Sequence, residues 1–179
     1  HLAAVASVHL SWGSVQKTVT VNSIGTINLI EELQHIPDRP SLLLVGSADE
    51  YGAVSPRRQP PRESFPCEPR SPYALSTTWQ ETLGSFYARL EDWPIFLTRT
   101  FNHTGPRQSP DFVCSDFARQ IALIEAGRRE PVLRVGNLRA ARDFLDVRDV
   151  GAEGDIDDDG PIGISRVRAR PCTATLIAD

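Results

Sequence analysis

Short apolar runs that alternate with longer amphipathic segments constrain the fold of this chain more than any other feature. Four runs have the length of strands: residues 1–7 (HLAAVAS), 41–47 (SLLLVGS), 94–102 (PIFLTRTFN) and 131–136 (PVLRVG). Three stretches between them have helical spacing: residues 14–35, 73–91 and 111–127, the last closed by Gly127 as a C-cap. This alternation indicates right-handed crossover units. The predicted fold is therefore α/β, with a mostly parallel, doubly wound sheet.

The chain divides into one folded domain and a tail. Its 179 residues suffice for one sizeable core. Proline and arginine crowd residues 55–72, which predicts a surface loop. Residues 151–179 begin with an acidic, glycine-rich stretch and lack amphipathic spacing until their end. We therefore expect a domain over residues 1–150 and an acidic, weakly structured tail over 151–179.

Charge and composition exclude several classes of partner. The net charge is -4 at pH 7 and no basic stripe is present, so we expect no nucleic-acid partner. No apolar run is long enough for a bilayer, so we expect no membrane partner. The three cysteines, Cys67, Cys114 and Cys172, are too far apart for a metal knuckle, which favours a reducing, cytoplasmic setting. The chain begins at His1 without a leader pattern, so we expect a missing start and predict no targeting segment.

The tail contains a motif similar to a calcium loop. Three acidic residues alternate ahead of Gly160: Asp155, Asp157 and Asp159. The twelfth place of such a loop needs a bidentate glutamate, and here it holds Arg166, whose charge would repel calcium. We therefore predict no metal site.

Two positions suggest chemistry at the carboxyl end of a strand. Ser47 ends a predicted buried strand, and Asp49 lies two residues later. Polar and acidic residues at the carboxyl end of a strand can orient a substrate carbonyl group. The same residues also suit an ordinary turn, and the sequence leaves both interpretations open. Tyr73 begins a helix, and its phenol acts as an acid or base only if the pKa falls from about 10, usually through a cation at i+4. That place is Thr77, which carries no charge. By itself, Tyr73 is interpreted as a half-buried amphipathic residue.

Six segments together resemble a known family. In chain order they are HLAA, VNSIGTINLIEEL, LLVGSADEYG, SPYALST, TRTFNHTGPRQSPDFVCSDFARQIALIEAG and EPVLRVGNLRAARDFLDVRDV. Residues 1–150 thereby resemble the extended short-chain dehydrogenase/reductase family of nucleotide-sugar enzymes. FNHTGP followed by GNLRAARDFLDVRDV is most similar to the branch of GDP-mannose 4,6-dehydratase and GDP-4-keto-6-deoxymannose reductase. The resemblance implies a Rossmann-type sheet, NADP or NAD as cofactor, a GDP-sugar substrate and hydride exchange at the sugar C4.

The resemblance also implies roles at matching positions of the catalytic centre. Ser47 would hydrogen-bond the C4 oxygen, Tyr73 would donate or accept a proton there, and Asn22 would support the site. Asp49 stands where the dehydratases carry a catalytic glutamate, and its shorter carboxylate favours reduction.

The cofactor and the sugar diphosphate would contact other residues. Tyr73 would also contact the cofactor, whose nicotinamide would lie against Leu2, Ala3 and Ala4. Asn102 would approach the diphosphate, and Arg142 would clamp a phosphate through its planar fork, unless it is simply a solvated charge. His103 is interpreted as a loop or packing residue.

Two departures from the family pattern bear on activity. Thr77 replaces the family's lysine, and Lys17, the one lysine in the chain, lies on another predicted helix. No G-x-G-x-x-G or G-x-x-G-x-x-G motif occurs, and the likeness starts at the family's fourth strand. We therefore expect the sheet to lack the N-terminal Gly-rich βαβ unit. Such a sheet has an apolar edge, which predicts association, as a homo-oligomer or through that open edge.

Two hypotheses of function remain at this point. The chain is either an NAD(P)-dependent nucleotide-sugar dehydratase or reductase, or an inactive remnant that serves as a non-catalytic binding or interaction module. Because the likeness stops after DVRDV, we also hypothesise that the chain is a fragment whose tail has been read in a shifted frame.

Overall fold

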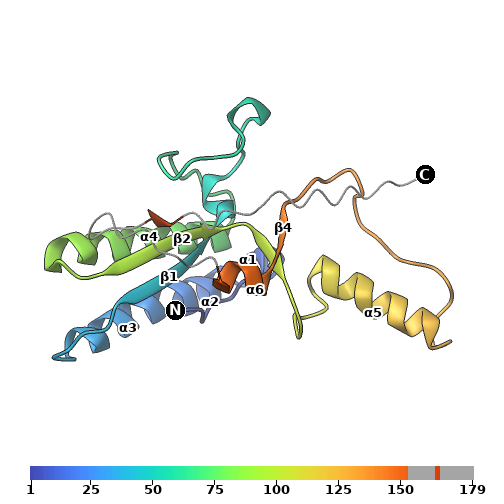
Figure 1. Cartoon of the computed structure of the whole chain (residues 1–179), viewed down its shortest axis with the longest axis horizontal. Coiled ribbons are helices and arrows are strands. Elements are labelled where there is room, and N and C mark those ends of the chain that lie inside the picture. Colours follow the sequence, from blue (N-terminus) through green and yellow to red (C-terminus); the bar gives the residue numbers. More distant parts are fainter. Residues whose placement is uncertain (153–163, 166–179) are drawn as a thin grey trace. The chain divides into compact units, whose positions relative to one another are not determined.

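The computed structural model describes residues 1–152 and 164–165, which fall into two compact units (Figure 1). The first unit contains His1–Phe101 and strand β5 (Ile164–Ser165). The second unit begins at Asn102 and includes helix α6 (Val147–Ala152).

A parallel sheet forms the centre of the first unit. Strands β1 (Leu42–Ser47) and β2 (Ile95–Thr100) pair in parallel, and the strand order is β1-β2-β5. The register joins Leu42 to Ile95 and Ser47 to Thr100, so both strands end at the same level. The strands expected over residues 41–47 and 94–102 are confirmed as β1 and β2, and Ser47 lies at the carboxyl edge of the sheet.

Helix α4 (Pro72–Glu91) packs against this sheet. The preceding elements α1 (Val8–Gly13), α2 (Val15–Val19) and the π-helical turn η1 (Thr20–Ile24) contact α4, and α3 (Gly25–Gln34) contributes to the core of the unit. In Figure 1, α4 runs along β1 and β2, with which it makes close contact. The shared core contains Ile30 of α3, Ala88 of α4 and sheet residues Leu42, Leu44, Ile95 and Leu97, with Trp93. Each large apolar side chain buried there contributes about 1.5–3 kcal/mol.

Gly84 sets how closely α4 approaches the sheet. A Cβ at that position would lie 2.6 Å from Leu44 Cδ1 and 2.8 Å from Leu97 Cδ2, both far below van der Waals contact. The missing side chain therefore lets the helix backbone lie directly on the strands.

Two sequence predictions in the first unit need correction. Residues 1–7 form no strand; His1 N donates to Leu43 O at 2.6 Å, and the rest of the segment runs without a β-ladder. Its main chain is bound at Val5 by the side chain of Asn22, which takes the place of a neighbouring strand. The single helix expected over residues 14–35 is interrupted by η1, which carries Asn22.

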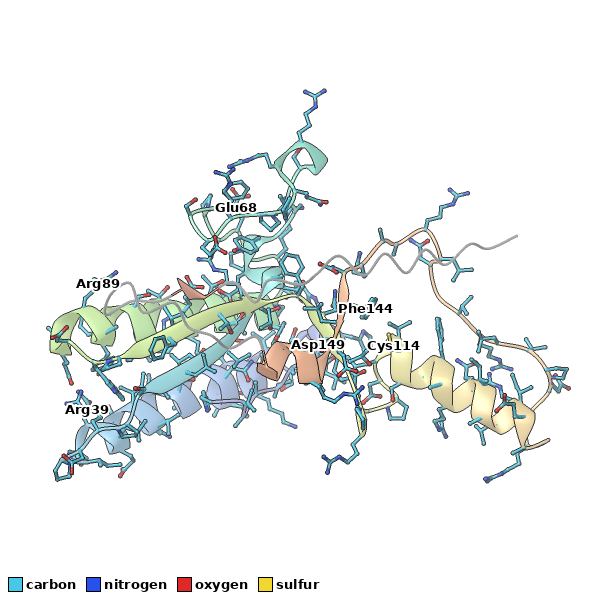
Figure 2. The ribbon with its side chains drawn as sticks, in the orientation of Figure 1. Arg39, Glu68, Arg89, Cys114, Phe144 and Asp149 are labelled. Carbon is cyan, nitrogen blue, oxygen red and sulfur yellow. The ribbon has the colours of Figure 1, made fainter. Side chains whose placement is uncertain are left out.

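The second unit contains a small parallel pair of strands and a longer helix. Strand β3 (Asn102–Thr104) pairs with β4 (Phe144–Asp146), and α5 (Val113–Glu125) follows β3 in the chain. Phe144 and Cys114, near the starts of β4 and α5, are labelled in Figure 2. Gly127 has φ +66° and follows the C-cap Ala126, as expected for a glycine that ends a helix.

The strand expected over residues 131–136 is not formed. This segment is exposed, and Gln120 binds its main chain: Nε2 donates to Arg134 O at 2.9 Å, and Arg134 N donates to Oε1 at 2.8 Å. An apolar run alone cannot guarantee a partner strand, and here a side-chain amide satisfies the backbone instead.

The expected surface loop between the 3₁₀ turn η2 (Ala48–Tyr51) and α4 is confirmed, and it contains the short 3₁₀ turn η3 (Pro56–Arg58). Most of the tail, including Asp155, Asp157, Asp159 and Cys172, lies outside the described residues, as does the predicted frame shift. Of residues 151–179, the end of α6 and strand β5 are described. Within the described ranges, no helix combines the length and apolar character that crossing a bilayer requires.

Candidate functional site

Ser47 and Tyr73 come together at the carboxyl end of β1. Ser47 is the N-cap of the 3₁₀ turn η2 (Ala48–Tyr51), and its Oγ accepts a hydrogen bond from Asp49 N at 3.2 Å. Tyr73 lies in the first turn of α4, which Ser71 caps through a 3.0 Å bond from Ala74 N to its Oγ. The Ser47 side chain lies close enough to the phenol of Tyr73 to lower its pKa. The structure therefore places these two predicted residues side by side.

The phenol of Tyr73 is held in its protonated form. Burial raises its pKa above the usual 10, and the negative charges of Asp49 and Glu50 act in the same direction. The Ser47 hydroxyl group lowers the pKa of Tyr73 but does not outweigh burial. At neutral pH the phenol is thus a proton donor.

Asn22 joins the N-terminal segment to the start of α4. Its fully buried side chain accepts from Val5 N at 2.7 Å and donates to Ser76 Oγ at 2.9 Å. Ser76 Oγ in turn donates to Tyr73 O at 2.7 Å. The expected supporting role of Asn22 thus has a route to Tyr73. Ser76 was not predicted as a site residue from the sequence. The signal that could have indicated it was its position three residues after Tyr73.

The residues expected at the cofactor lie on the segment that Asn22 anchors. Leu2, Ala3 and Ala4 are exposed, with Leu2 at 82%. Their side chains are free of the core of the first unit and available to an apolar ring.

Thr77 stands where the family's cation is expected, but its side chain is occupied. It is 2% exposed, and its Oγ1 donates to Ala74 O at 3.0 Å. It lines a narrow gap between α4 and the sheet, together with Gly46 and Gln80, in which a water molecule has no room. Lys17 is exposed on α2. The helix that carries Tyr73 therefore offers no positive charge at position 77.

Glu50, Arg99 and Glu81 form a buried ion-pair cluster next to Ser47, which we call the Glu50–Arg99–Glu81 cluster. Glu50 is 0% exposed, its Oε1 accepts from Ser47 N at 2.7 Å, and its Oε2 lies 3.9 Å from Arg99 Nε. Arg99 binds Glu81 through two bonds of 2.6 Å. Burial, reinforced by the charge of Glu81, raises the pKa of Glu50 to about 8, although Ser47 N–H and Arg99 oppose the shift. This cluster was not predicted from the sequence; the signal that could have indicated it was an arginine inside an apolar strand.

The thiol of Cys67 lies next to the Glu50–Arg99–Glu81 cluster. Its Sγ and carboxylate oxygens of Glu50 and Glu81 all lie within 4.8 Å of one another, a spacing that suits a metal ion. Both oxygens of Glu81 are already bonded to Arg99, however, and burial raises the pKa of the Cys67 thiol, which disfavours the thiolate. The guanidinium of Arg99 occupies the position in which a cation would be needed.

Asn102 and Arg142 belong to the second unit and lie near each other there. Asn102 is exposed on β3, and its Nδ2 donates to Asp143 O at 3.1 Å. Arg142 is exposed, and its Nη1 donates to Ala141 O at 2.8 Å. Both side chains are thus available to an anion. His103 pairs with Leu145 in the β3–β4 ladder and is half-buried, in line with a packing residue.

Comparison with known proteins decides the family. The sequence profile described as GDP-mannose 4,6 dehydratase matches residues 1–153. The chain belongs to this family. The GDP-6-deoxy-D-mannose reductase of Pseudomonas aeruginosa is 37% identical over 150 residues, which are 84% of this chain and 49% of that protein. The GDP-mannose 4,6-dehydratase of Vibrio cholerae is 31% identical, over 83% of this chain and 40% of that protein.

Solved structures of GDP-mannose 4,6-dehydratase relatives confirm the Rossmann-type α/β fold. The structure of RMD from Pseudomonas aeruginosa complexed with NADPH has a TM-score of 0.82 and 36% identity, and covers 86% of this chain and 52% of that one. UDP-glucuronic acid 4-epimerase from Bacillus cereus, in complex with UDP-glucuronic acid and NAD, has a TM-score of 0.71 and 31% identity, over 84% of this chain and 45% of that one. The chain thus spans about half the length of the relatives it matches.

Proposed function

We propose that this chain carries the sugar-chemistry part of an NAD(P)-dependent nucleotide-sugar enzyme of the GDP-mannose 4,6-dehydratase and GDP-4-keto-6-deoxymannose reductase type. The observation that carries the proposal is the placement of Ser47 beside the phenol of Tyr73 at the carboxyl end of β1. In parallel α/β sheets this edge is where ligands bind. The match to the family over residues 1–153 supports the same assignment.

The proposed chemistry takes place at the C4 oxygen of the sugar. Ser47 donates a hydrogen bond to that oxygen and stabilises the negative charge that develops on it during reduction. Tyr73 then gives its proton to the oxygen. The raised pKa of Tyr73 keeps the phenol protonated at neutral pH, so the arrangement suits an acid better than a base. The short, exposed side chain of Asp49 fits the same direction, reduction at C4.

The described residues fit the nicotinamide end of the cofactor but offer little to its ribose. Leu2, Ala3 and Ala4 present exposed apolar groups on the segment that Asn22 ties to Tyr73. The hydroxyl of Thr77 is already bonded to Ala74 and carries no charge for the ribose or the phenol. NADPH or NADH, when bound, supplies the hydride to C4.

For the remainder of the substrate we assign the diphosphate of a GDP-sugar to Asn102 and Arg142. Both are exposed, and the planar guanidinium of Arg142 matches the geometry of a phosphate. We place the reaction in the cytoplasm, because Cys67 and Cys114 are free thiols, as is usual in reducing compartments.

The second candidate is an inactive remnant that binds a nucleotide sugar or a protein partner without catalysis. The buried and already bonded Thr77 favours it, because the phenol has no cation to lower its pKa. The two candidates differ in turnover and share the sugar-nucleotide site.

A thermal melt with GDP-mannose, or with NADPH, tests the proposed site. Ligand at 100 times its Kd stabilises a protein by about 2.7 kcal/mol, which moves Tm by several degrees for a chain of this size. We expect GDP-mannose to raise Tm in the wild-type chain and less so after Arg142→Ala. A Tm that GDP-mannose and NADPH both leave unchanged would reject the proposal. Hydride consumption with a 4-keto sugar nucleotide then separates the enzyme from the remnant.

A further inference from the structure

Glu50 is a fully buried acid that the steps above do not use. It lies three residues after Ser47 in the turn η2 and is 0% exposed. Its Oε1 accepts the Ser47 N–H at 2.7 Å, and its Oε2 makes no hydrogen bond to any residue that the structure describes. Burying a carboxyl group with one oxygen unsatisfied costs stability. A residue of this kind in a turn next to a candidate site is typical of positioning.

Four elements fix the place of Glu50. From β2, Arg99 approaches its Oε2 and is itself clamped by the two oxygens of Glu81 on α4. From the surface loop, Glu68, labelled in Figure 2, donates its N–H to Glu50 O at 2.8 Å. From β1, Gly46 leaves room for the carboxyl, because a Cβ there would overlap Glu50 Oε1. The acid is thus held from the strands, the helix and the loop at once.

The bond from Ser47 N–H to Glu50 is half of a reciprocal pair. Ser47 Oγ accepts from the backbone of the turn while Glu50 reaches back to the Ser47 N–H, the arrangement of a capping box. Backbone and side chain of Ser47 are therefore both fixed by η2. The Ser47 hydroxyl, which this arrangement holds in place, is the one that lowers the pKa of Tyr73.

We propose that Glu50 is a positioning residue that holds the backbone of Ser47 so that its hydroxyl points at the phenol of Tyr73. The inference rests on the proposed function for the roles of Ser47 and Tyr73, and adds a residue that acts on the reaction only through Ser47. Arg99 and Glu81 serve it as a rigid frame.

The charge of Glu50 gives the proposal a measurable signature. Arg99 from β2, Glu81 and Tyr73 from α4, and Cys67 from the loop are the titratable groups that face its carboxyl group. The pKa of Glu50 is about 8, so the acceptor of the Ser47 N–H changes from a neutral acid to a carboxylate in the mildly alkaline range. The chemical shift of the Ser47 amide proton must follow that change.

The test follows the Ser47 amide and the Tyr73 ring by NMR in the complete chain from pH 5 to 9. We expect the wild-type Ser47 amide to titrate with a midpoint near 8. Glu50→Gln and Glu50→Leu form a matched pair, since both are uncharged and glutamine alone keeps an acceptor. In Glu50→Gln the amide should stop titrating and stay protected from exchange. In Glu50→Leu it should exchange about tenfold faster, and the Tyr73 ring signals should move to their positions in Ser47→Ala.

Two results would overturn the proposal. One is a wild-type Ser47 amide that exchanges with solvent at the rate of an unprotected amide, a measurement that needs no variant and survives any failure of Glu50→Leu to fold. The other is a Glu50→Leu spectrum in which Ser47 and Tyr73 behave as in Glu50→Gln. Neither measurement contains GDP-mannose or NADPH, so a failed proposed function, seen as absent ligand binding, is distinguished from a failed role for Glu50.

Discussion

At position 50 the chain buries an acid beside a second acid, and the two share one arginine. Arg99 forms two bonds of 2.6 Å with Glu81 and lies 3.9 Å from Glu50, so its charge compensates Glu81 first. Glu50 therefore stays protonated at neutral pH, because its pKa is raised. Sequence analysis found Ser47 and Tyr73 through their positions at element boundaries, but it could not find this cluster, because its three members come from separate elements.

Stability should fall as pH rises through the neutral range. The pKa of Glu50 goes from 4.5 in the unfolded chain to about 8 in the folded one, so the folded state holds the extra proton between these values. From pH 5 to 8 the wild-type free energy of unfolding should drop by about 3 kcal/mol relative to Glu50→Gln. Urea titrations of both proteins at pH 5, 6.5 and 8 measure the difference. Equal slopes against pH in the two proteins would contradict the raised pKa.

A lysine at position 77 should lower the pKa of Tyr73 at a cost in stability. Thr77 is 2% exposed beside a gap with no room for water, so a longer side chain should lower the free energy of unfolding by about 1–3 kcal/mol. A cation one helical turn after the phenol should lower its pKa by about 1–3 units. Thr77→Met is the control, because it adds similar length without charge. Ultraviolet titration against Tyr73→Phe backgrounds gives the pKa, and equal values in the two variants would count against the electrostatic account.

Among the elements, the predicted strands that failed share one physical cause. The strands predicted over residues 41–47 and 94–102 formed, and they pair over residues 42–47 and 95–100. Residues 1–7 and 131–136 have similar runs, yet a single side-chain amide binds both the N–H and the C=O of one residue in each: Asn22 at Val5 and Gln120 at Arg134. Hydrophobic pattern predicts that a segment is extended, but the partner of its backbone depends on residues far away in the sequence.

Gln120 should control the order of the segment around Arg134. It is 3% exposed and holds both main-chain groups of that residue. Gln120→Leu should keep α5, since leucine is a good helix former, while the Arg134 amide loses its acceptor. Hydrogen exchange at Arg134 should then become about tenfold faster, with amides near Leu44 unchanged as an internal reference. Unaltered protection at Arg134 would show that the amide is dispensable.

For the molecule as a whole, α4 leaves an apolar face uncovered in the described structure. Leu75, Trp79, Phe86 and Leu90 are 56%, 40%, 50% and 63% exposed, and their spacing places them on one side of the helix. β1 is also an edge strand among the described strands of its sheet. Both features favour the association that the sequence led us to expect, through the helix or through the strand edge.

Self-association should therefore depend on one of these two surfaces. We expect the purified chain to elute from size exclusion as a dimer or larger at about 50 μM, above typical dissociation constants of weak dimers. Phe86→Glu with Leu90→Glu should yield a monomer if α4 is the interface, whereas Leu43→Lys should do so if the edge of β1 is. Light scattering gives the mass of each. A wild-type chain that is monomeric at that concentration would reject both routes.

The contacts of Gly46 limit which residue evolution can place at that position. A Cβ there would overlap Glu50 Oε1 and would also lie 2.5 Å from the main-chain oxygen of Thr98. A shorter residue at position 50 would remove the first overlap, but the carbonyl group of β2 would still fill the space. Lineages should therefore keep the glycine at position 46 whether or not they keep the acid at position 50.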